Sequence, residues 1–279
     1  MSNLITRTIT GVFFIAIIIG SILLSQLAIV VLFAIITVLG TWELYKLSEK
    51  DGIKPQKIIG VIGAFLLFLS NTFFVFTIPP NLFRFNWEGL TCLLIIPILF
   101  LFFIVELFRK TQKPFTNIAY TFLGIIYVAL PLSMINYIVC PDPEIGYQPN
   151  ILLGFFFLLW TYDTVAYLIG INFGKHRLFE RISPKKTWEG SIGGAVICFV
   201  IAYIISIYFT ELGVVDWLVI AAIIIVFSTL GDLVQSLFKR SLNIKDSGKI
   251  LPGHGGILDR FDGLLLSTPF VFIYLQLIR

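Results

Sequence analysis

Charged residues are scarce in this chain of 279 residues. They make up 13% of it, whereas hydrophobic residues make up 58% and the mean hydropathy is +0.96. A soluble domain carries about 25% charged residues. The composition therefore excludes an ordinary soluble domain and predicts an integral membrane protein. The net charge of +4 does not indicate a nucleic-acid partner, because no long basic segment stands apart from the apolar runs.

Cysteine and histidine are also rare. Cys92, Cys140 and Cys198 lack metal-ligand spacing, so we interpret them as packing residues. His176 and His254 have no cysteine placed to help them, which argues against a zinc site. The sequence also lacks a clear signal-peptide cleavage site near its start, fixed-period repeats and low-complexity linkers. We therefore interpret residues 1–279 as one integral membrane domain.

Apolar runs long enough to cross a bilayer recur along the chain. Crossing about 30 Å of hydrocarbon takes roughly 20 helical residues. We identify nine runs, near residues 8–24, 27–45, 57–78, 90–108, 117–139, 150–171, 190–209, 216–235 and 260–278. The first two are almost continuous, and only Gly20, Ser21, Ser25 and Gln26 indicate a tight hairpin between them. The predicted fold is therefore all-α and polytopic, with about nine transmembrane helices.

The basic residues predict how these spans are oriented. If the N-terminus is cytosolic, nine alternating spans place all of the 20 Lys and Arg residues except Arg84 and Arg279 in cytosolic segments. Treating residues 9–39 as one span would move most basic loops outside. We therefore expect a cytosolic N-terminus, an external C-terminus and a location in the cell inner membrane.

Polar residues concentrate in the second part of the chain. Residues 1–115 carry few intramembrane charges, the main one being Glu106, and we interpret them as a helical scaffold. Residues 116–279 are the predicted catalytic region, with cytosolic loops at residues 172–189 and 236–260.

The stretch from residue 236 to residue 262 is unusually polar, with three Asp, five Lys or Arg, one His and a Gly-Gly step. Just before it, Asp232 shares a helical face with Ser236 and with Lys239 or Arg240. A carboxylate near the hydrocarbon boundary is costly unless it is paired or metal-bound. Asp232 is therefore a candidate metal ligand, and the alternative is a structural salt bridge with a nearby Lys or Arg.

A loop rich in proline and glycine follows. The backbone N–H groups of Gly255 and Gly256 can hold an anion where such a loop enters a helix, although a plain turn has the same composition. His254 is a candidate for phosphate binding or proton transfer, or a structural hydrogen-bond partner. The cations suited to phosphate oxygens in this stretch are Lys239, Arg240, Lys245, Lys249 and Arg260.

Asp259 and Asp262 lie three residues apart where the last helix is predicted to begin, so both can face one point. Paired carboxylates among cations suit Mg²⁺ that is shared with substrate phosphates. The alternative is that they stabilise the positive end of the helix.

A second polar segment covers residues 163–194. Ser183 and Thr187 supply hydroxyl groups before the seventh span, and Lys185 and Lys186 flank that helix start. The alternative for both lysines is an ordinary positive-inside role. Asp163 lies within the sixth span, where it can bind a substrate group or pair with a cation of the loop.

Residues 236–262 resemble the signature of the phosphatidate cytidylyltransferases, also called CDP-diacylglycerol synthases, without departure from its pattern. Residues 163–194 resemble the same family at the expected distance upstream. The resemblance implies transfer of a cytidylyl group from CTP to phosphatidic acid, giving CDP-diacylglycerol and pyrophosphate for phospholipid synthesis. It also implies a Mg²⁺ cofactor, membrane-lipid partners and an active site that faces the cytosol, and a homodimer is one open oligomeric state.

On this basis we assign hypothetical roles to the polar residues. The predicted Mg²⁺ ligands are Asp232, Asp259 and Asp262, and the predicted catalytic set adds Asp246 and His254 to them. The predicted nucleotide and phosphate contacts are Ser183, Lys185, Lys186, Thr187, Ser236, Lys239, Arg240, Lys245, Gly255, Gly256 and Arg260. Two alternatives stay open, a CTP-dependent lipid kinase and a secondary transporter. A transporter of that kind has broken helices, midplane charges and often internal repeats.

Overall fold

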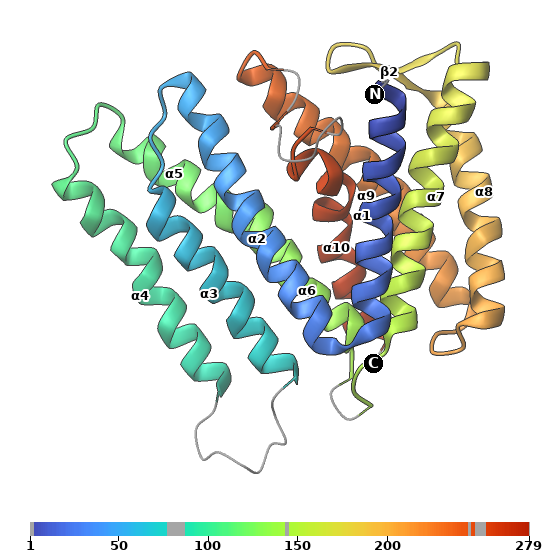
Figure 1. Ribbon diagram of the computed structural model, residues 1–279, viewed down its shortest axis with the longest axis horizontal. Helices are drawn as coiled ribbons and strands as arrows, with labels where there is room; N and C mark the ends of the chain where they lie inside the picture. Colours follow the sequence, from blue (N-terminus) through green and yellow to red (C-terminus); the bar gives the residue numbers. More distant parts are fainter. Residues whose placement is uncertain (1–2, 77–86, 143–144, 245–246, 249–254, 279) are drawn as a thin grey trace. The chain divides into compact units, whose positions relative to one another are not determined.

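The computed structural model describes residues 3–76, 87–142, 145–244, 247–248 and 255–278. Three of the predicted site residues, Lys245, Asp246 and His254, lie outside the described residues. The long helices of the described part are α1 (Asn3–Leu24), α2 (Gln26–Ser48), α3 (Lys57–Phe76), α4 (Trp87–Phe108), α5 (Pro114–Gly124), α6 (Leu130–Val139), α7 (Pro149–Phe173), α8 (Trp188–Tyr208), α9 (Val214–Ser241) and α10 (Leu258–Leu277) (Figure 1). The shorter elements are a 3₁₀ turn, η1 (Glu49–Asp51), a π turn, η2 (Ile125–Ala129), and the strands β1 (Arg177–Phe179) and β2 (Ser183–Thr187).

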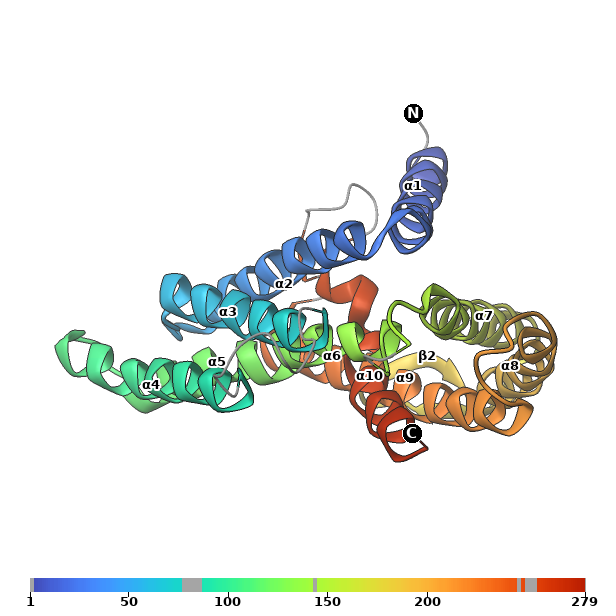
Figure 2. The same cartoon turned by 90° about the horizontal axis from the view of Figure 1, so that it is seen from below.

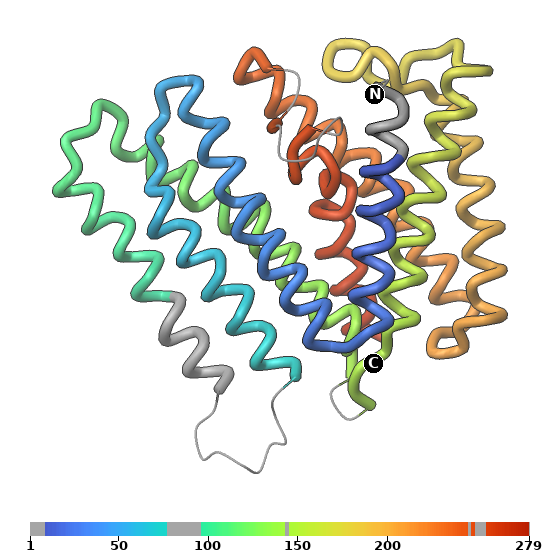
Figure 3. The backbone as a smooth tube through the Cα atoms, viewed as in Figure 1, coloured from blue at the N-terminus to red at the C-terminus, as the bar shows by residue number. Residues whose placement is uncertain are grey.

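The predicted apolar runs coincide with helices, which confirms the mainly helical fold. The fifth run corresponds to α5, η2 and α6, which together form one continuous helical segment (Figure 3). Among the described residues, six segments are long and apolar enough to cross a membrane: Gln26–Asp51, Lys57–Phe76, Pro114–Val139, Pro149–Phe173, Trp188–Tyr208 and Val214–Ser241. Many large apolar side chains on these helices are exposed, as lipid-facing surfaces require. The protein is therefore a membrane protein, while nine crossings and the orientation stay predictions.

The boundary between α1 and α2 is a single residue. Ser25 has an extended backbone, and its hydroxyl accepts a hydrogen bond from the N–H of Ala28 at 3.2 Å. A serine in this position satisfies one of the N–H groups that the first turn of a helix leaves without a partner. The predicted break between the first two runs is therefore present, and Ser25 caps the start of the second helix.

The chain forms two compact units, which we describe separately. The first contains Met1–Gly146 and Asp246–Arg260, and the second contains Tyr147–Lys245 and Phe261–Arg279. The division expected from the sequence, near residue 115, stays a prediction.

In the first unit, α3 packs against α2, α4, α5 and α6. Its apolar core includes Ala64, Phe102 and Ile125. Beside this core lies the buried carboxylate of Glu106, which accepts hydrogen bonds from the Gln56 and Asn117 amides, each at 2.9 Å. The intramembrane charge noted in the sequence is therefore part of a polar network among α4, α5 and the start of α3.

In the second unit, α7, α8 and α9 lie side by side (Figure 2). The α7–α8 contact is close, because a Cβ at Gly194 would approach the Cβ of Ala166 to 2.9 Å. Small residues commonly allow such close packing between membrane helices. Between these helices the chain forms an antiparallel hairpin in which β1 pairs with β2. We call residues 175–187 the hairpin segment. The sequence predicted this region as a loop and missed its strands.

Candidate active site

The hairpin segment contacts α9 through an ion pair. Lys186 Nζ lies 2.7 Å from Asp232 Oδ2, and it also donates to the carbonyl oxygen of Thr229 at 3.4 Å. One turn further along α9, the hydroxyl of Ser236 donates to Asp232 Oδ1 at 3.4 Å. Asp232 and Ser236 therefore lie on one face of α9 and are in contact, as their spacing predicted. The open alternative for Asp232, a pair with a nearby cation, is also present, with Lys186 as the partner.

Asp163 lies on α7 near this pair. Its Oδ1 accepts a hydrogen bond from the Ser228 hydroxyl of α9 at 3.0 Å. The carboxylate is also within electrostatic range of Lys186 and Asp232. Although it lies in a membrane-length helix, Asp163 is exposed. An ionisable residue at such a position is by default a functional-site hypothesis, and the role of Asp163 stays a prediction.

Asp262 joins the same neighbourhood from α10. A Cβ at Gly231 would clash with the Asp262 carbonyl oxygen, so the glycine allows α9 and α10 to meet closely there. The Asp262 carboxylate experiences repulsion from Asp232 and Asp163 and attraction from Lys239. We call Asp163, Asp232 and Asp262, which come from three helices, the carboxylate cluster.

The residue types of the carboxylate cluster are those that bind a divalent ion shared with a substrate, and the ion itself stays a prediction. Among the described residues, no three His, Cys, Asp or Glu side chains already converge on one metal position. Mg²⁺ usually keeps several waters and binds one or two carboxylates together with substrate phosphates. Three mutually repelling carboxylates beside Lys186 and Lys239 supply that chemistry. Asp232 and Asp262 are the predicted ligands within the cluster.

The first unit holds a different carboxylate that sequence reasoning missed. Glu43 of α2 is only 4% exposed. Its Oε2 accepts a hydrogen bond from the Ile257 N–H at 2.8 Å, and its Oε1 accepts from the Leu258 N–H at 3.3 Å. The Ser247 hydroxyl also donates to Oε1. Glu43 therefore binds residues on both sides of the glycine-rich loop and caps the start of α10.

Asp259 reinforces this arrangement. Its Oδ2 accepts hydrogen bonds from the Ser247 N–H at 2.9 Å and from the Gly256 N–H at 3.2 Å. The contacts support the open alternative in which Asp259 stabilises the start of α10. Its role as a metal ligand stays a prediction. We call residues 247–248 and 255–258 the loop anchors, because Glu43 and Asp259 hold them.

Gly255 and Gly256 occupy special positions in the loop anchors. Gly255 has φ +84°, a left-handed conformation that favours glycine. A Cβ at Gly256 would clash with Glu43 Oε1 and with the Ser247 hydroxyl. A tight turn against Glu43 therefore accounts for glycine at both positions. Anion binding by the N–H groups of Gly255 and Gly256 stays a prediction.

The remaining predicted contacts lie at helix ends and along the hairpin segment. Thr187 is the N-cap of α8, and its hydroxyl accepts from the Gly190 N–H at 3.2 Å. Ser183 begins β2 and is half-buried, whereas Lys185 is exposed.

The other predicted contacts lie at the ends of α9 and α10. Lys239 and Arg240 lie in the last turn of α9, and Arg260 is exposed in the first turn of α10. Their roles toward a nucleotide stay predictions.

The signal for Glu43 was present in the sequence. It is an acidic residue inside an apolar run, the pattern that drew attention to Asp163. The local pattern could not identify the hydrogen-bond partners of Glu43, because they lie 204 to 215 residues away along the chain.

Comparison with known proteins identifies the family of the chain. The chain matches the profile of the cytidylyltransferase family over residues 5–278. A phosphatidate cytidylyltransferase of Bacillus subtilis (strain 168) is 32% identical over 285 aligned residues, which cover 99% of each chain. A phosphatidate cytidylyltransferase of Staphylococcus haemolyticus is 40% identical over 168 residues, and this match covers 60% of the present chain but only 62% of that relative. With a profile match over almost its whole length and a full-length relative of this kind, the chain belongs to the cytidylyltransferase family.

Proposed function

We propose that this protein transfers a cytidylyl group from CTP to phosphatidic acid and so makes CDP-diacylglycerol and pyrophosphate. The observation that carries the proposal is the carboxylate cluster beside Lys186 and Lys239, within a membrane protein of this family. The name of the full-length relative supports phosphatidic acid as the acceptor.

The reaction needs charge control more than a strong base. A phosphate oxygen of phosphatidic acid is already anionic, and it forms a bond to the α-phosphorus of CTP. The bond from that phosphorus to the bridging oxygen breaks, and pyrophosphate leaves. Two polyanions must therefore be held in line while their repulsion is reduced.

Each part of the site has a role in this scheme. Asp232 and Asp262 would hold Mg²⁺, and Asp163 would add negative charge beside them. When bound, Mg²⁺ neutralises charge on the phosphates and orients them. Lys186 and Lys239 bind phosphate oxygens, and Lys186 also holds the hairpin segment against α9 through Asp232. Glu43 and Asp259 keep the loop anchors in one conformation.

The basic segments support a cytosolic position for this site. The hairpin segment and the end of α9 carry many of the basic residues, and the positive-inside rule assigns such segments to the cytosol, where CTP is available. Cysteine labelling from either side of sealed vesicles, with single cysteines at positions 181 and 240 in a cysteine-free background, tests that assignment.

Incubating the purified full-length protein with labelled CTP, Mg²⁺ and phosphatidic acid tests the proposed reaction. We expect pyrophosphate and a CDP-linked lipid. CDP together with a phosphorylated lipid would instead identify a lipid kinase. If no CTP is consumed with any lipid acceptor, the proposal fails and transport becomes the leading alternative.

A further inference from the structure

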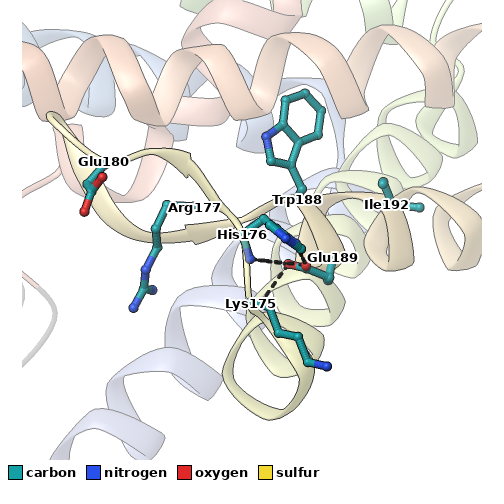
Figure 4. Close-up of a pocket in the computed structure, with 7 residues that line it drawn as sticks. All are labelled: Lys175, His176, Arg177, Glu180, Trp188, Glu189 and Ile192. Carbon is teal, nitrogen blue, oxygen red and sulfur yellow. Dashed lines mark hydrogen bonds and ion pairs between the residues drawn. The ribbon is translucent and has the colours of Figure 1, made fainter.

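A surface pocket of about 680 Å³ lies between the hairpin segment and the first turns of α8. It is lined by Lys175, His176, Arg177, Glu180, Trp188, Glu189 and Ile192 (Figure 4). None of these residues belongs to the carboxylate cluster or to the predicted nucleotide contacts. The volume falls in the range of small-molecule sites, roughly 300–1,000 Å³.

The wall of the pocket is fixed by Glu189. Its carboxylate accepts hydrogen bonds from the Lys175 N–H at 3.0 Å and from the His176 N–H at 3.2 Å. The His176 ring lies against the same carboxylate, with Nδ1 and Oε1 2.6 Å apart (Figure 4). Glu189 is therefore engaged by donors on the chain that enters β1.

The charge of the hairpin segment is strongly positive. Lys175, Arg177, Arg181 and Lys185 are all exposed, and Glu180 is its one acidic residue. In Figure 4, Glu180 lies at one end of the pocket, beyond Arg177. The pocket also adjoins the N-terminus of α8, which carries partial positive charge. The pocket lining itself has two cations, Lys175 and Arg177, and two carboxylates, Glu180 and Glu189. Because Glu189 already accepts from three donors and Glu180 lies at one end, Lys175 and Arg177 are the charges that an anionic ligand would meet.

Apolar surface continues directly from the pocket along α8. Trp188 and Ile192 line the pocket, and further exposed apolar residues follow on the same helical face: Val196, Phe199, Val200, Tyr203 and Ile207. This helix is long and apolar enough to cross a membrane. Tryptophan is typical of the membrane–water interface, where acyl chains end and headgroups begin. We call these residues, with Trp188 and Ile192, the apolar stripe of α8.

We propose that this pocket binds the headgroup of an anionic glycerophospholipid whose acyl chains lie on the apolar stripe of α8. Lys175 and Arg177 contact the phosphate, and Trp188 lies at the glycerol level. A soluble anion would use the cations alone, whereas the continuous apolar stripe selects a ligand that carries acyl chains. The site docks the hairpin segment on the membrane surface, apart from the carboxylate cluster.

Trp188 provides a direct readout of occupancy. The full-length protein is placed in phosphatidylcholine nanodiscs that contain a minor fraction of phosphatidylglycerol with dibrominated acyl chains. Bromine quenches nearby tryptophan fluorescence, and the signal lost in Trp188→Phe reports the Trp188 contribution. Phosphatidylglycerol is not the proposed substrate, so the measurement does not depend on turnover.

We expect brominated phosphatidylglycerol to quench Trp188 more strongly than brominated phosphatidylcholine at the same fraction. The double variant K175A/R177A lowers the apparent affinity for the anionic lipid about thirtyfold, since two cations near the surface contribute roughly 1 kcal/mol each. The matched control is K110A/K113A, which removes two exposed lysines from the connection between α4 and α5. Both double variants lose two positive charges. We expect K110A/K113A to keep the preference for the anionic lipid. Melting curves of all variants check that they are folded.

Three results would overturn the proposal. One is equal quenching by the two lipids in the wild type. Another is an equal loss in K175A/R177A and K110A/K113A, which would indicate general surface electrostatics. The third is displacement of the lipid by millimolar inorganic phosphate or glycerol 3-phosphate, which would assign the pocket to a soluble anion.

Discussion

Glu43 and Ile257 are joined by a 2.8 Å hydrogen bond although 214 positions separate them in the sequence. The bond connects α2, the second helix of the chain, to the residue that precedes α10. Because Glu43 also accepts from Ser247 and Leu258, one buried carboxylate organises both loop anchors. Helix α2 therefore holds the segments that flank the glycine-rich loop, while the scaffold role of residues 1–115 stays a prediction.

Glu43→Gln tests this organising role. Glutamine keeps the size of the side chain but replaces one acceptor oxygen by a donor that faces N–H groups. We expect a loss of stability of about 1.5–3 kcal/mol, typical of hydrogen bonds to charged groups, and a fall in kcat that exceeds any rise in KM for CTP.

The matched control is Glu106→Gln, which alters another glutamate that is 4% exposed in the same unit. Its hydrogen-bond partners Gln56, Thr111 and Asn117 lie outside the loop anchors. It should lower the melting temperature without a comparable loss of kcat, and Glu43→Asp should recover part of the activity. Equal kinetic effects of the two glutamine variants would reduce Glu43 to a general stabilising residue.

Asp262→Asn separates function from stability in the second unit. The substitution removes repulsion from Asp232 and Asp163 and can keep the bond in which Asp262 Oδ1 accepts from the Gly263 N–H at 2.8 Å. We expect an unchanged or raised melting temperature together with a loss of transfer of at least about 100-fold, as for other electrostatic catalytic groups.

Asp51→Asn, at an exposed position of η1, is the control and should leave both quantities unchanged. Assays at increasing Mg²⁺ complete the test. Transfer at the wild-type rate in Asp262→Asn would exclude this carboxylate from the metal site.

Lys186→Ala distinguishes phosphate binding from a purely structural ion pair. Lys186 and Asp232 are 25% and 38% exposed, and pairs of this kind contribute at most about 1 kcal/mol. We expect a small change in melting temperature but a rise of about tenfold or more in KM for CTP, because removing one charge-assisted contact to a phosphate costs roughly 1.5–3 kcal/mol.

The chain offers a close control in Lys57→Ala. Lys57 and Glu49 form an ion pair with nearly the same exposure, 25% and 40%. The stability changes of the two alanine variants should be similar, and only Lys186→Ala should alter the CTP dependence. A CTP dependence unchanged in both variants would assign Lys186 to structure and positive-inside orientation.

Gly256→Ala tests the tight turn against Glu43. The added methyl group would clash with Glu43 Oε1 and the Ser247 hydroxyl, so we expect a loss of about 1–3 kcal/mol, as for other overpacked sites. Gly20→Ala in α1 is the control, because its methyl group meets nothing within 4 Å. Thermal melting compares the two, and equal melting temperatures would show that the turn can relax.

The sequence predicted the helices well because the length of each apolar run can be compared directly with the length of a membrane-crossing helix. Thr187 is one example, since a hydroxyl residue before an apolar run predicts the N-cap that the structure contains. The strands Arg177–Phe179 and Ser183–Thr187 were missed, because they are short, charged and without an alternating apolar pattern.

Parts of the site were predictable for the same reason. The spacing of Asp232 and Ser236 follows from helical geometry, and their contact agrees with it. The link from Lys186 to Asp232 and the partners of Glu43 depend on how distant segments pack, which a local pattern does not encode. The metal and nucleotide roles of these residues stay predictions that the variants above test.

The extended backbone of Ser25 has a consequence for the whole chain. This residue decides whether the first 48 residues count as one crossing or two, and so it sets the parity of all crossings that follow. In the predicted topology, fusing α1 and α2 into a single helix would move every later loop to the opposite side of the membrane, and the hairpin segment would face away from the cytosol. If the predicted topology holds, a single hydroxyl-capped break near the N-terminus sets the side of the membrane on which the carboxylate cluster lies.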